Sequence, residues 1–367
     1  MDNISKESLG KGPASDIPGE AGKDTVSGTK NEITKDSVMG SPGSISPDEF
    51  AYAQDVVNKL SFYYSSVVVG QETLRRSLIS AIIADGHILL ESVPGLAKTT
   101  AAKAIAAACG GKFSRIQCTP DLLPSDIIGT QIYHQETGKF ETIFGPVFAN
   151  YVLLDEVNRS SAKTQSAMLE AMQERQVTIG GITYRMPQDI FIVIATQNPI
   201  EQEGTYPLSE AQTDRFLIKE VLDYPSVQEE IEVMNRIESG SIKNGPAVLT
   251  ITDVDVVQAI SEKVYVDEAI KKYIASIVDK TRSQERLPRS VQEYVRSGAS
   301  PRASIAFMNL AKAIALMDGR TYVIPDDVKS IRYPVLRHRI GLSYAAIADG
   351  IKPENIIDEI VNSVKTP

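Results

Sequence analysis

The segment Glu91–Thr100 constrains the fold of this chain most, because a short loop there joins an apolar run to an alanine-rich helical pattern. The helical pattern spans Thr99–Cys109 and stops at Gly110–Gly111, a common C-terminal signal. A strand, a tight loop, a lysine, a hydroxyl and a helix N-terminus together predict a phosphate-binding loop. The residues of this predicted loop are Val93, Pro94, Gly95, Leu96, Ala97, Lys98, Thr99 and Thr100.

Two of these residues have the chemistry that a triphosphate and its cation need. Lys98 is expected to span the terminal phosphates, and the hydroxyl of Thr99 is expected to bind Mg2+. The generic loop pattern has glycine where this chain has Ser92 and Ala97, so an ordinary strand–turn–helix connection is the alternative.

Composition limits the class of protein. The 367 residues are 42% hydrophobic and 23% charged, which predicts a globular chain with room for two domains and no transmembrane segment. The cysteines, Cys109 and Cys118, lack metal-ligand spacing and favour a reducing, cytoplasmic compartment. The net charge of −9 argues against a surface that binds nucleic acid broadly, so we expect no nucleic-acid partner.

The chain divides into three predicted parts. Residues 1–46 contain no aromatic residue and no apolar period, so we expect a disordered tail. From 47 to 225, short apolar runs alternate with helical patterns, which predicts an α/β domain with a mostly parallel sheet between helices. From 226 to 367 the pattern is helical without a convincing strand, which predicts an all-α domain. Two hairpins, 129–143 and 176–186, are expected within the α/β part.

Polar residues follow two of the predicted strands. The strand 151–154 ends in Asp155 and Glu156, and the strand 191–195 leads to Asn198. Ligands of parallel sheets bind at the carboxyl ends of strands, so Asp155 is expected to hold Mg2+, partly through water, and Glu156 to polarise the attacking water. Asn198 would orient that water, although a turn-capping asparagine explains it equally well.

Two arginines are candidates for transition-state stabilisation. Arg215 precedes the last strand and is expected to face away from the chain's own phosphate loop, so it would reach a neighbour's nucleotide. Its alternative is a surface arginine paired with Asp214. Arg302 starts a helix after Ser300 and Pro301 and is expected to reach the γ-phosphate, against the alternative of an exposed first-turn arginine.

A series of ordered motifs resembles the MoxR family of AAA+ ATPases. They are 68–71 (VVGQ), 93–99 (VPGLAKT), 145–146 (GP), 154–159 (LDEVNR), 165–174 (QSAMLEAMQE), 195–199 (ATQNP), 210–216 (EAQTDRF) and 300–302 (SPR). The resemblance runs from about residue 68 to 338. Ser92, Ser160, Ser161 and Thr213 differ from the commoner residues of that family.

The resemblance implies a P-loop domain with a five-stranded parallel sheet, followed by an α-helical lid. It implies that Val69, Gly70 and Gln71 flank adenine, that Lys98, Thr99 and Thr100 bind ATP and Mg2+, and that Asp155 and Glu156 form the Walker B pair. Asn198 would be sensor 1, Arg215 the arginine finger and Arg302 sensor 2. It also implies a homo-oligomer, as a hexameric ring, and a client or adaptor with a von Willebrand factor A domain.

The resemblance thus implies an oligomeric, chaperone-like ATPase that remodels or matures a client complex or inserts metal into it. Two alternatives stay open: a nucleic-acid motor or loader of the same superfamily, and a nucleotide-gated scaffold with little turnover. The acidic net charge disfavours the first. The presence of Glu156, Asn198 and Arg215 disfavours the second.

Overall fold

The computed structural model describes residues 33–38, 40–93, 95–186, 190–199, 205–241 and 245–367. The part from Ile33 to Pro367 forms one compact unit, so the predicted domain boundary near residue 225 stays a prediction. The predicted tail up to residue 32 and the loop residue Pro94 lie outside the described residues.

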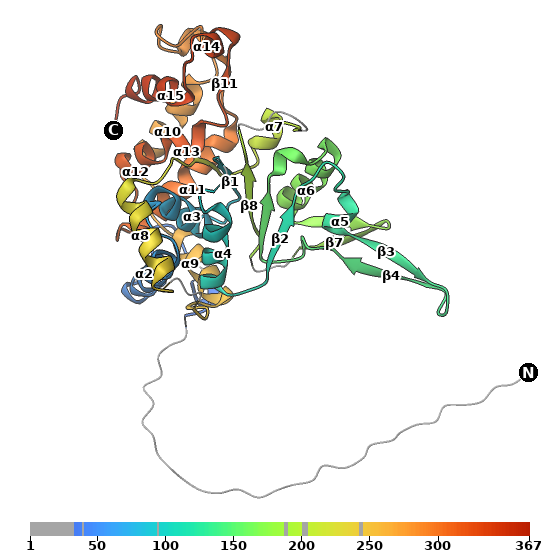
Figure 1. The fold of residues 1–367 in the computed structure, drawn as a ribbon. Coiled ribbons are helices and arrows are strands. Elements are labelled where there is room, and N and C mark those ends of the chain that lie inside the picture. The colour runs from blue at the N-terminus through green and yellow to red at the C-terminus, as the bar shows by residue number, and fades with distance from the viewer. Residues whose placement is uncertain (1–32, 39, 94, 187–189, 200–204, 242–244) are drawn as a thin grey trace, which may run out of the picture. The chain divides into compact units, whose positions relative to one another are not determined.

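A five-stranded parallel sheet forms the centre of the α/β part, as predicted (Figure 1). Its strands lie in the order β2-β5-β8-β1-β9, and every neighbouring pair is parallel. Their bounds are β1 Ile88–Glu91, β2 Phe113–Gln117, β5 Tyr151–Asp155, β8 Ile192–Gln197 and β9 Ile218–Val221.

Alternate residues of the strands enter two separate hydrophobic clusters, because successive side chains of a strand point to opposite faces. Ile88 and Leu90 belong to one cluster and Leu89 to the other. The first cluster contains the buried faces of α2 (Pro47–Val67), α3 (Glu72–Ile83) and α4 (Lys98–Cys109). The second contains residues of α5 (Pro124–Ile128) and α6 (Ala162–Glu174). Helices therefore cover both faces of the sheet.

The segment after β9 is mostly helical (Figure 1). Its helices are α8 Val227–Glu238, α9 Ile251–Glu262, α10 Glu268–Lys280, α11 Pro301–Met317, α12 Pro325–Ser330, α13 Arg332–Leu336, α14 Tyr344–Ala348 and α15 Pro353–Asn362. The prediction that no strand occurs here is wrong in one detail, since β10 (Val295–Ser297) and β11 (Gly341–Leu342) form a short antiparallel pair. Strands of two or three residues are too short to give a periodic sequence signal.

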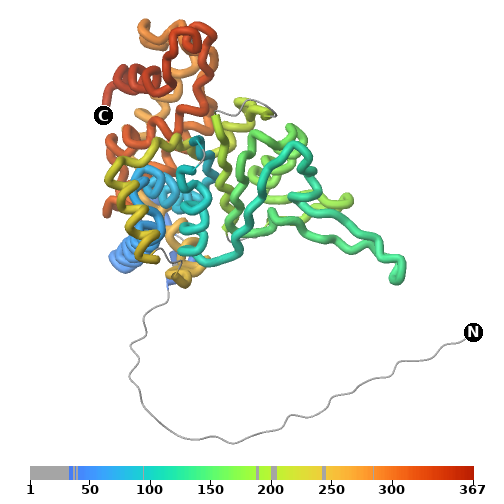
Figure 2. Tube along the Cα trace, in the orientation of Figure 1, coloured from blue at the N-terminus to red at the C-terminus, as the bar shows by residue number. Residues whose placement is uncertain are grey.

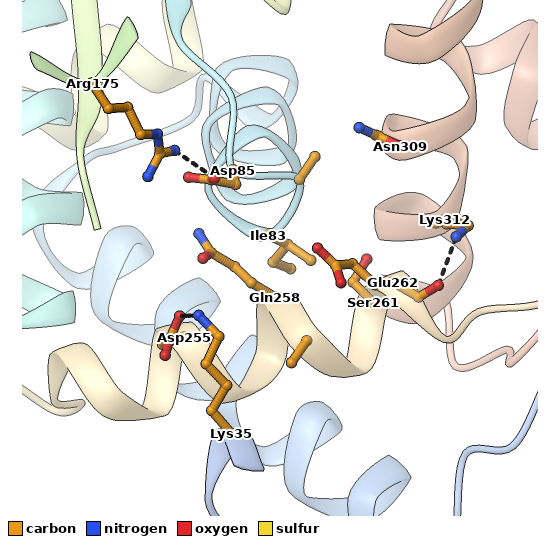
Figure 3. A pocket seen from close by; sticks show the side chains of 12 residues that line it. Lys35, Ile83, Asp85, Arg175, Asp255, Gln258, Ser261, Glu262, Asn309 and Lys312 are labelled. Carbon is orange, nitrogen blue, oxygen red and sulfur yellow. Dashed lines mark hydrogen bonds and ion pairs between the residues drawn. The ribbon is translucent and has the colours of Figure 1, made fainter. Parts of the chain in front are cut away.

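The structure corrects the extent of the predicted tail. A short helix, α1 (Lys35–Val38), contacts α9, and Val38 is buried. Lys35 Nζ lies 2.6 Å from a carboxylate oxygen of Asp255, beside a cavity of about 190 Å³ (Figure 3). Residues 33–46 therefore include ordered structure. Its contacts, which include the buried Val38, the partly buried Ile33 and Ile45 and a hydrogen bond from the Gly43 amide to Lys263 O, follow no apolar period in the sequence.

Both predicted hairpins are present. They are β3–β4 (Gly129–His134 and Lys139–Phe144) and β6–β7 (Gln176–Ile179 and Ile182–Arg185). The β3–β4 hairpin extends away from the sheet (Figures 1 and 2). The hairpins touch each other, because Thr142 Oγ1 lies 2.9 Å from Tyr184 Oη and the ring of Phe144 meets that of Tyr184 edge-on. Among the described residues, no helix has the length and apolar character to cross a membrane.

A buried histidine at the amino end of β1 makes stability depend on pH. His87 Nδ1 accepts a hydrogen bond from the Val193 amide, so Nε2 carries the proton that is donated to Met172 O. Burial lowers the pKa of His87 from 6.5 to about 4, although the bond to Met172 opposes the shift. Between these values the unfolded chain binds a proton that the folded chain does not, so stability falls as the pH is lowered.

We expect this histidine alone to remove about 1.4 kcal/mol of unfolding free energy per pH unit between pH 6.5 and 4. Urea unfolding of wild-type protein and of His87→Gln at several pH values measures the difference. A wild-type slope equal to that of the variant would contradict a neutral buried His87. His338 is also buried, but it is present in both proteins and cancels in the comparison.

Candidate nucleotide-binding site

The predicted phosphate loop joins the carboxyl end of β1 to the N-terminus of α4. Gly95 has φ +88° and Ala97 has φ +53°, so both residues adopt the left-handed backbone conformation that tight turns require. A Cβ added at Gly95 would meet no atom within 4 Å. Ala97, which precedes α4, makes no side-chain cap hydrogen bond, and the first-turn amides of a helix are groups that can bind phosphate oxygens. Lys98 Nζ donates to Ser92 O at 2.9 Å.

Oxygen ligands for a cation lie beside this loop. Thr99 Oγ1 is 3.4 Å from Asp155 Oδ2, at the end of β5. Burial alone would raise the pKa of Asp155, but hydrogen bonds from Arg115 and Thr196 outweigh it and hold this pKa below its ordinary value. The carboxyl group is therefore charged at neutral pH. A hydroxyl next to a carboxylate is a donor set that Mg2+ accepts.

Glu156 stands at the same edge of the sheet in a strained backbone conformation. Its φ is +58°, which a residue with a side chain adopts at a cost and which is common at functional sites. Its carboxylate accepts hydrogen bonds from Gln117 Nε2 at 3.1 Å and from Arg159 Nη1 at 3.0 Å. Asn198 follows β8 in a buried position, and its carbonyl accepts from Asn158 Nδ2. In the sheet, β8 lies between β1 and β5, so the carboxyl ends of these strands bring Lys98, Asp155, Glu156 and Asn198 to one side of the sheet.

Sequence reasoning missed two residues that touch Asp155. Arg115 on β2 donates to Asp155 Oδ2 through Nε at 3.1 Å and Nη2 at 2.5 Å. Thr196 donates to Asp155 Oδ1 at 2.7 Å and accepts from the Glu156 amide at 2.9 Å, so it links the two acids. A charged residue inside the apolar run 113–118 was the available signal for Arg115. Thr196 gave no signal, because its place beside Asp155 depends on strand register.

The residues expected to flank adenine lie between α2 and α3. Gly70 has φ +62°, and a Cβ there would be 1.9 Å from Glu229 Oε1 at the start of α8. Gln71 Nε2 lies 3.4 Å from Asp223 O, after β9. Val69 is half-buried. Residues 69–71 therefore lie against the segment that joins β9 to α8.

The two candidate arginines lie next to each other at the amino ends of the strands, on the side of the sheet opposite the phosphate loop. We call this side the amino edge, and the side with the phosphate loop the carboxyl edge. Arg215 Nε and Arg302 Nη2 both donate to Gln173 Oε1, at 2.8 and 3.4 Å. They line a cavity of about 270 Å³ together with Gly86 and His87, which precede β1, whereas the phosphate loop follows it. Figure 3 shows another part of this edge, where Arg175 pairs with Asp85.

This placement agrees with the expectation that Arg215 faces away from its own loop, and Arg215 is not paired with Asp214 as its alternative required. The expectation that Arg302 reaches a γ-phosphate stays a prediction. In the structure Arg302 lies beside Arg215, because α11 packs near the amino end of β1 and Asp214 accepts from Arg302 Nη1 at 3.4 Å.

Comparisons with known proteins agree with this geometry. Residues 87–218 match the model of the ATPase family associated with various cellular activities (AAA), and residues 289–360 match the AAA lid domain. The fold and the site together define an AAA ATPase, a class whose membership implies ATP binding and hydrolysis.

The relatives narrow this class. Chaperone MoxR1 of Mycobacterium tuberculosis (strain H37Rv) is 47% identical over 307 residues, which cover 83% of this chain and 81% of that protein. Protein MoxR of Paracoccus denitrificans is 29% identical over 299 residues, which cover 77% of this chain and 87% of that protein. The crystal structure of a proposed ATPase from Cytophaga hutchinsonii is 45% identical, with a TM-score of 0.81 and coverage of 87% and 97%. The chain belongs to the MoxR family of AAA ATPases.

Proposed function

We propose that this protein hydrolyses ATP, with Mg2+, at the boundaries between protomers of a homo-oligomer, and uses that cycle to remodel a client protein complex. The observation that carries the proposal is the separation of two half-sites. Lys98, Asp155 and Glu156 lie at the carboxyl edge of the sheet, and Arg215 and Arg302 lie at its amino edge. Neither half is complete alone, so a second protomer has to supply the arginines.

In this proposal each residue has one task. The loop 93–100 and the first-turn amides of α4 would bind phosphate oxygens, with Lys98 on the terminal phosphates. Thr99 and Asp155 would hold Mg2+, which would neutralise negative charge on the phosphates. Glu156 would polarise water, Asn198 would orient it, and Val69, Gly70 and Gln71 would flank adenine.

The proposed partners are further copies of this chain and a client protein. We infer a hexameric ring in the cytoplasm and a client or adaptor with a von Willebrand factor A domain. Support for a protein client comes from the hairpins, which expose large apolar side chains to solvent. Exposed apolar patches of this kind are typical of protein–protein contact sites. These side chains are Ile132, Tyr133, Phe140, Ile143 and Phe144 on the first hairpin and Ile182 on the second. Pull-down with ATP-loaded Glu156→Gln protein would identify the client.

Lys98→Ala tests the site itself. We expect ATP affinity to fall by about 100-fold, because the variant loses a charge-assisted contact to the phosphates. Calorimetric titration with ATP and Mg2+ measures it, and hydrolysis should fall in parallel. Lys103→Ala is the matched control, since Lys103 is an exposed lysine on the same helix. Wild-type affinity in Lys98→Ala would remove the proposed phosphate site.

A further inference from the structure

Two buried side chains from the helical part contact the backbone around Arg215. His338 Nε2 lies 3.2 Å from Phe216 O, and Arg339 makes more contacts. Arg339 follows α13, and only 2% of its side chain is exposed. Its Nε donates to Asp214 Oδ1 at 2.9 Å, and Nη2 donates to Asp214 O at 3.3 Å and to Phe216 O at 2.6 Å. Nη1 donates to Leu217 O at 3.1 Å and to Val335 O at 2.6 Å. Arg339 thus binds the chain on both sides of Arg215.

These contacts satisfy the donor capacity of a guanidinium, which has five N–H groups in a fixed plane. Burying a cation is costly unless it is paired and fully hydrogen-bonded, and apolar residues of similar volume often stabilise a core as well. Simple packing of α13 against β9 therefore does not require an arginine here. The planar group does fix the relative position of four backbone carbonyls and one carboxylate.

Asp214 extends the arrangement to the second arginine. Besides Arg339, its carboxylate accepts from Ser300 Oγ at 2.8 Å and from Arg302 Nη1 at 3.4 Å. Ser300 is the N-cap of α11, so Asp214 also holds the helix that carries Arg302. Thr213 adds a hydrogen bond to His338 O at 3.3 Å. One buried pair, Arg339–Asp214, therefore connects both candidate arginines to the end of α13.

We propose that Arg339 is a positioning residue for hydrolysis in the neighbouring protomer: through Asp214 it fixes the direction in which Arg215 and Arg302 leave the amino edge of the sheet. This inference rests on the proposed role of Arg215 in trans. A movement of α13 relative to β9 would then change the direction of Arg215 and Arg302 toward the neighbouring protomer. It would leave the phosphate loop of the same chain in place.

The test uses Arg339→Lys, which keeps the charge but cannot make the five-fold contact, and Asp214→Asn, which keeps the shape of the acceptor. We expect kcat to fall by about 10- to 100-fold, a part of the roughly 10³ to 10⁵ that a trans arginine supplies. Affinity of each variant for a fluorescent ATP analogue should stay within about twofold of wild type, because the phosphate loop is untouched. A large loss of nucleotide affinity would overturn the proposal.

Mixing separates positioning from misfolding. Glu156→Gln protomers are expected to have an inactive pocket but an intact arginine edge, so adding them should restore turnover in the pockets of the Arg339→Lys chains. A folding defect would not be rescued by this addition. Failure of rescue for both Arg339→Lys and Asp214→Asn, while Arg215→Ala is rescued, would overturn the positioning role. Wild-type kcat in both variants would overturn it as well.

Two controls make the outcomes distinguishable. Arg337→Lys alters a partly buried arginine of the same segment, which contacts Glu220 and Glu354 but none of residues 214–217. It should lower thermal stability and leave kcat near wild type. Arg215→Ala tests the premise: if Glu156→Gln protomers do not rescue it, the trans role fails, whatever Arg339 does.

Discussion

Replacing Glu156 with glutamine is expected to lower ATP turnover by roughly 10² to 10⁴, the usual contribution of a positioned general base. Glutamine has the same shape and retains a carbonyl oxygen for Gln117 and Arg159, the partners of Glu156 in the structure. It has no negative charge with which to polarise water. ATP affinity should therefore remain near wild type while phosphate release is lost.

Single-turnover phosphate release and calorimetric ATP titration measure the two quantities separately. Glu170→Gln is a matched control, because Glu170 is an exposed carboxylate on α6. Normal turnover in Glu156→Gln would assign water activation to another group. Loss of ATP binding in this variant would instead indicate that Glu156 shapes the pocket.

Replacing Arg215 with alanine is expected to have the largest effect on rate, roughly 10³ to 10⁵ for a trans arginine. The reason is its position, at the amino edge of the sheet beside Arg302, where its own loop is on the far side of β1. The variant should bind ATP normally. Mixing with Glu156→Gln protomers should restore turnover, because intact arginines then face intact pockets.

Dilution gives an independent readout of the same prediction. Specific activity of wild-type protein should fall when the protein is diluted below its assembly concentration, since separated protomers lack half of each site. Arg289→Ala, which removes an exposed arginine of the helical part, should leave activity and its concentration dependence unchanged. Activity that is independent of dilution would show that each chain completes its own site.

Much of the fold could be predicted because the signals were local. The predicted strands 151–154 and 191–195 are present as β5 and β8, and the predicted hairpins 129–143 and 176–186 are present as β3–β4 and β6–β7. The phosphate loop and the acids of β5 were predicted to meet because parallel strands end at one edge. Their charged and hydroxyl side chains are distinctive enough for this site to be predicted from the sequence.

The remaining features depend on relations between distant segments. Thr196 donates a hydrogen bond to Asp155 because Leu154 pairs with Ala195 in the sheet. No residue of either strand predicts this register. The position of Arg302 beside Arg215 could not be predicted, because the packing of α11 depends on Asp214, whose partners Ser300 and Arg339 lie 86 and 125 positions further along the chain. Val38 lies in a mostly polar segment without apolar periodicity, so the sequence pattern did not predict its burial against the helical part.

The location of the two half-sites at opposite ends of β1 has a consequence for symmetry. A two-fold pair presents one self-complementary patch on both partners, but here the donor and acceptor patches are different surfaces on different ends. Head-to-tail contact is the geometry that remains, and it either closes on itself or continues as an open spiral. In an open spiral one terminal pocket always lacks its arginines, whereas closure gives every chain a working one.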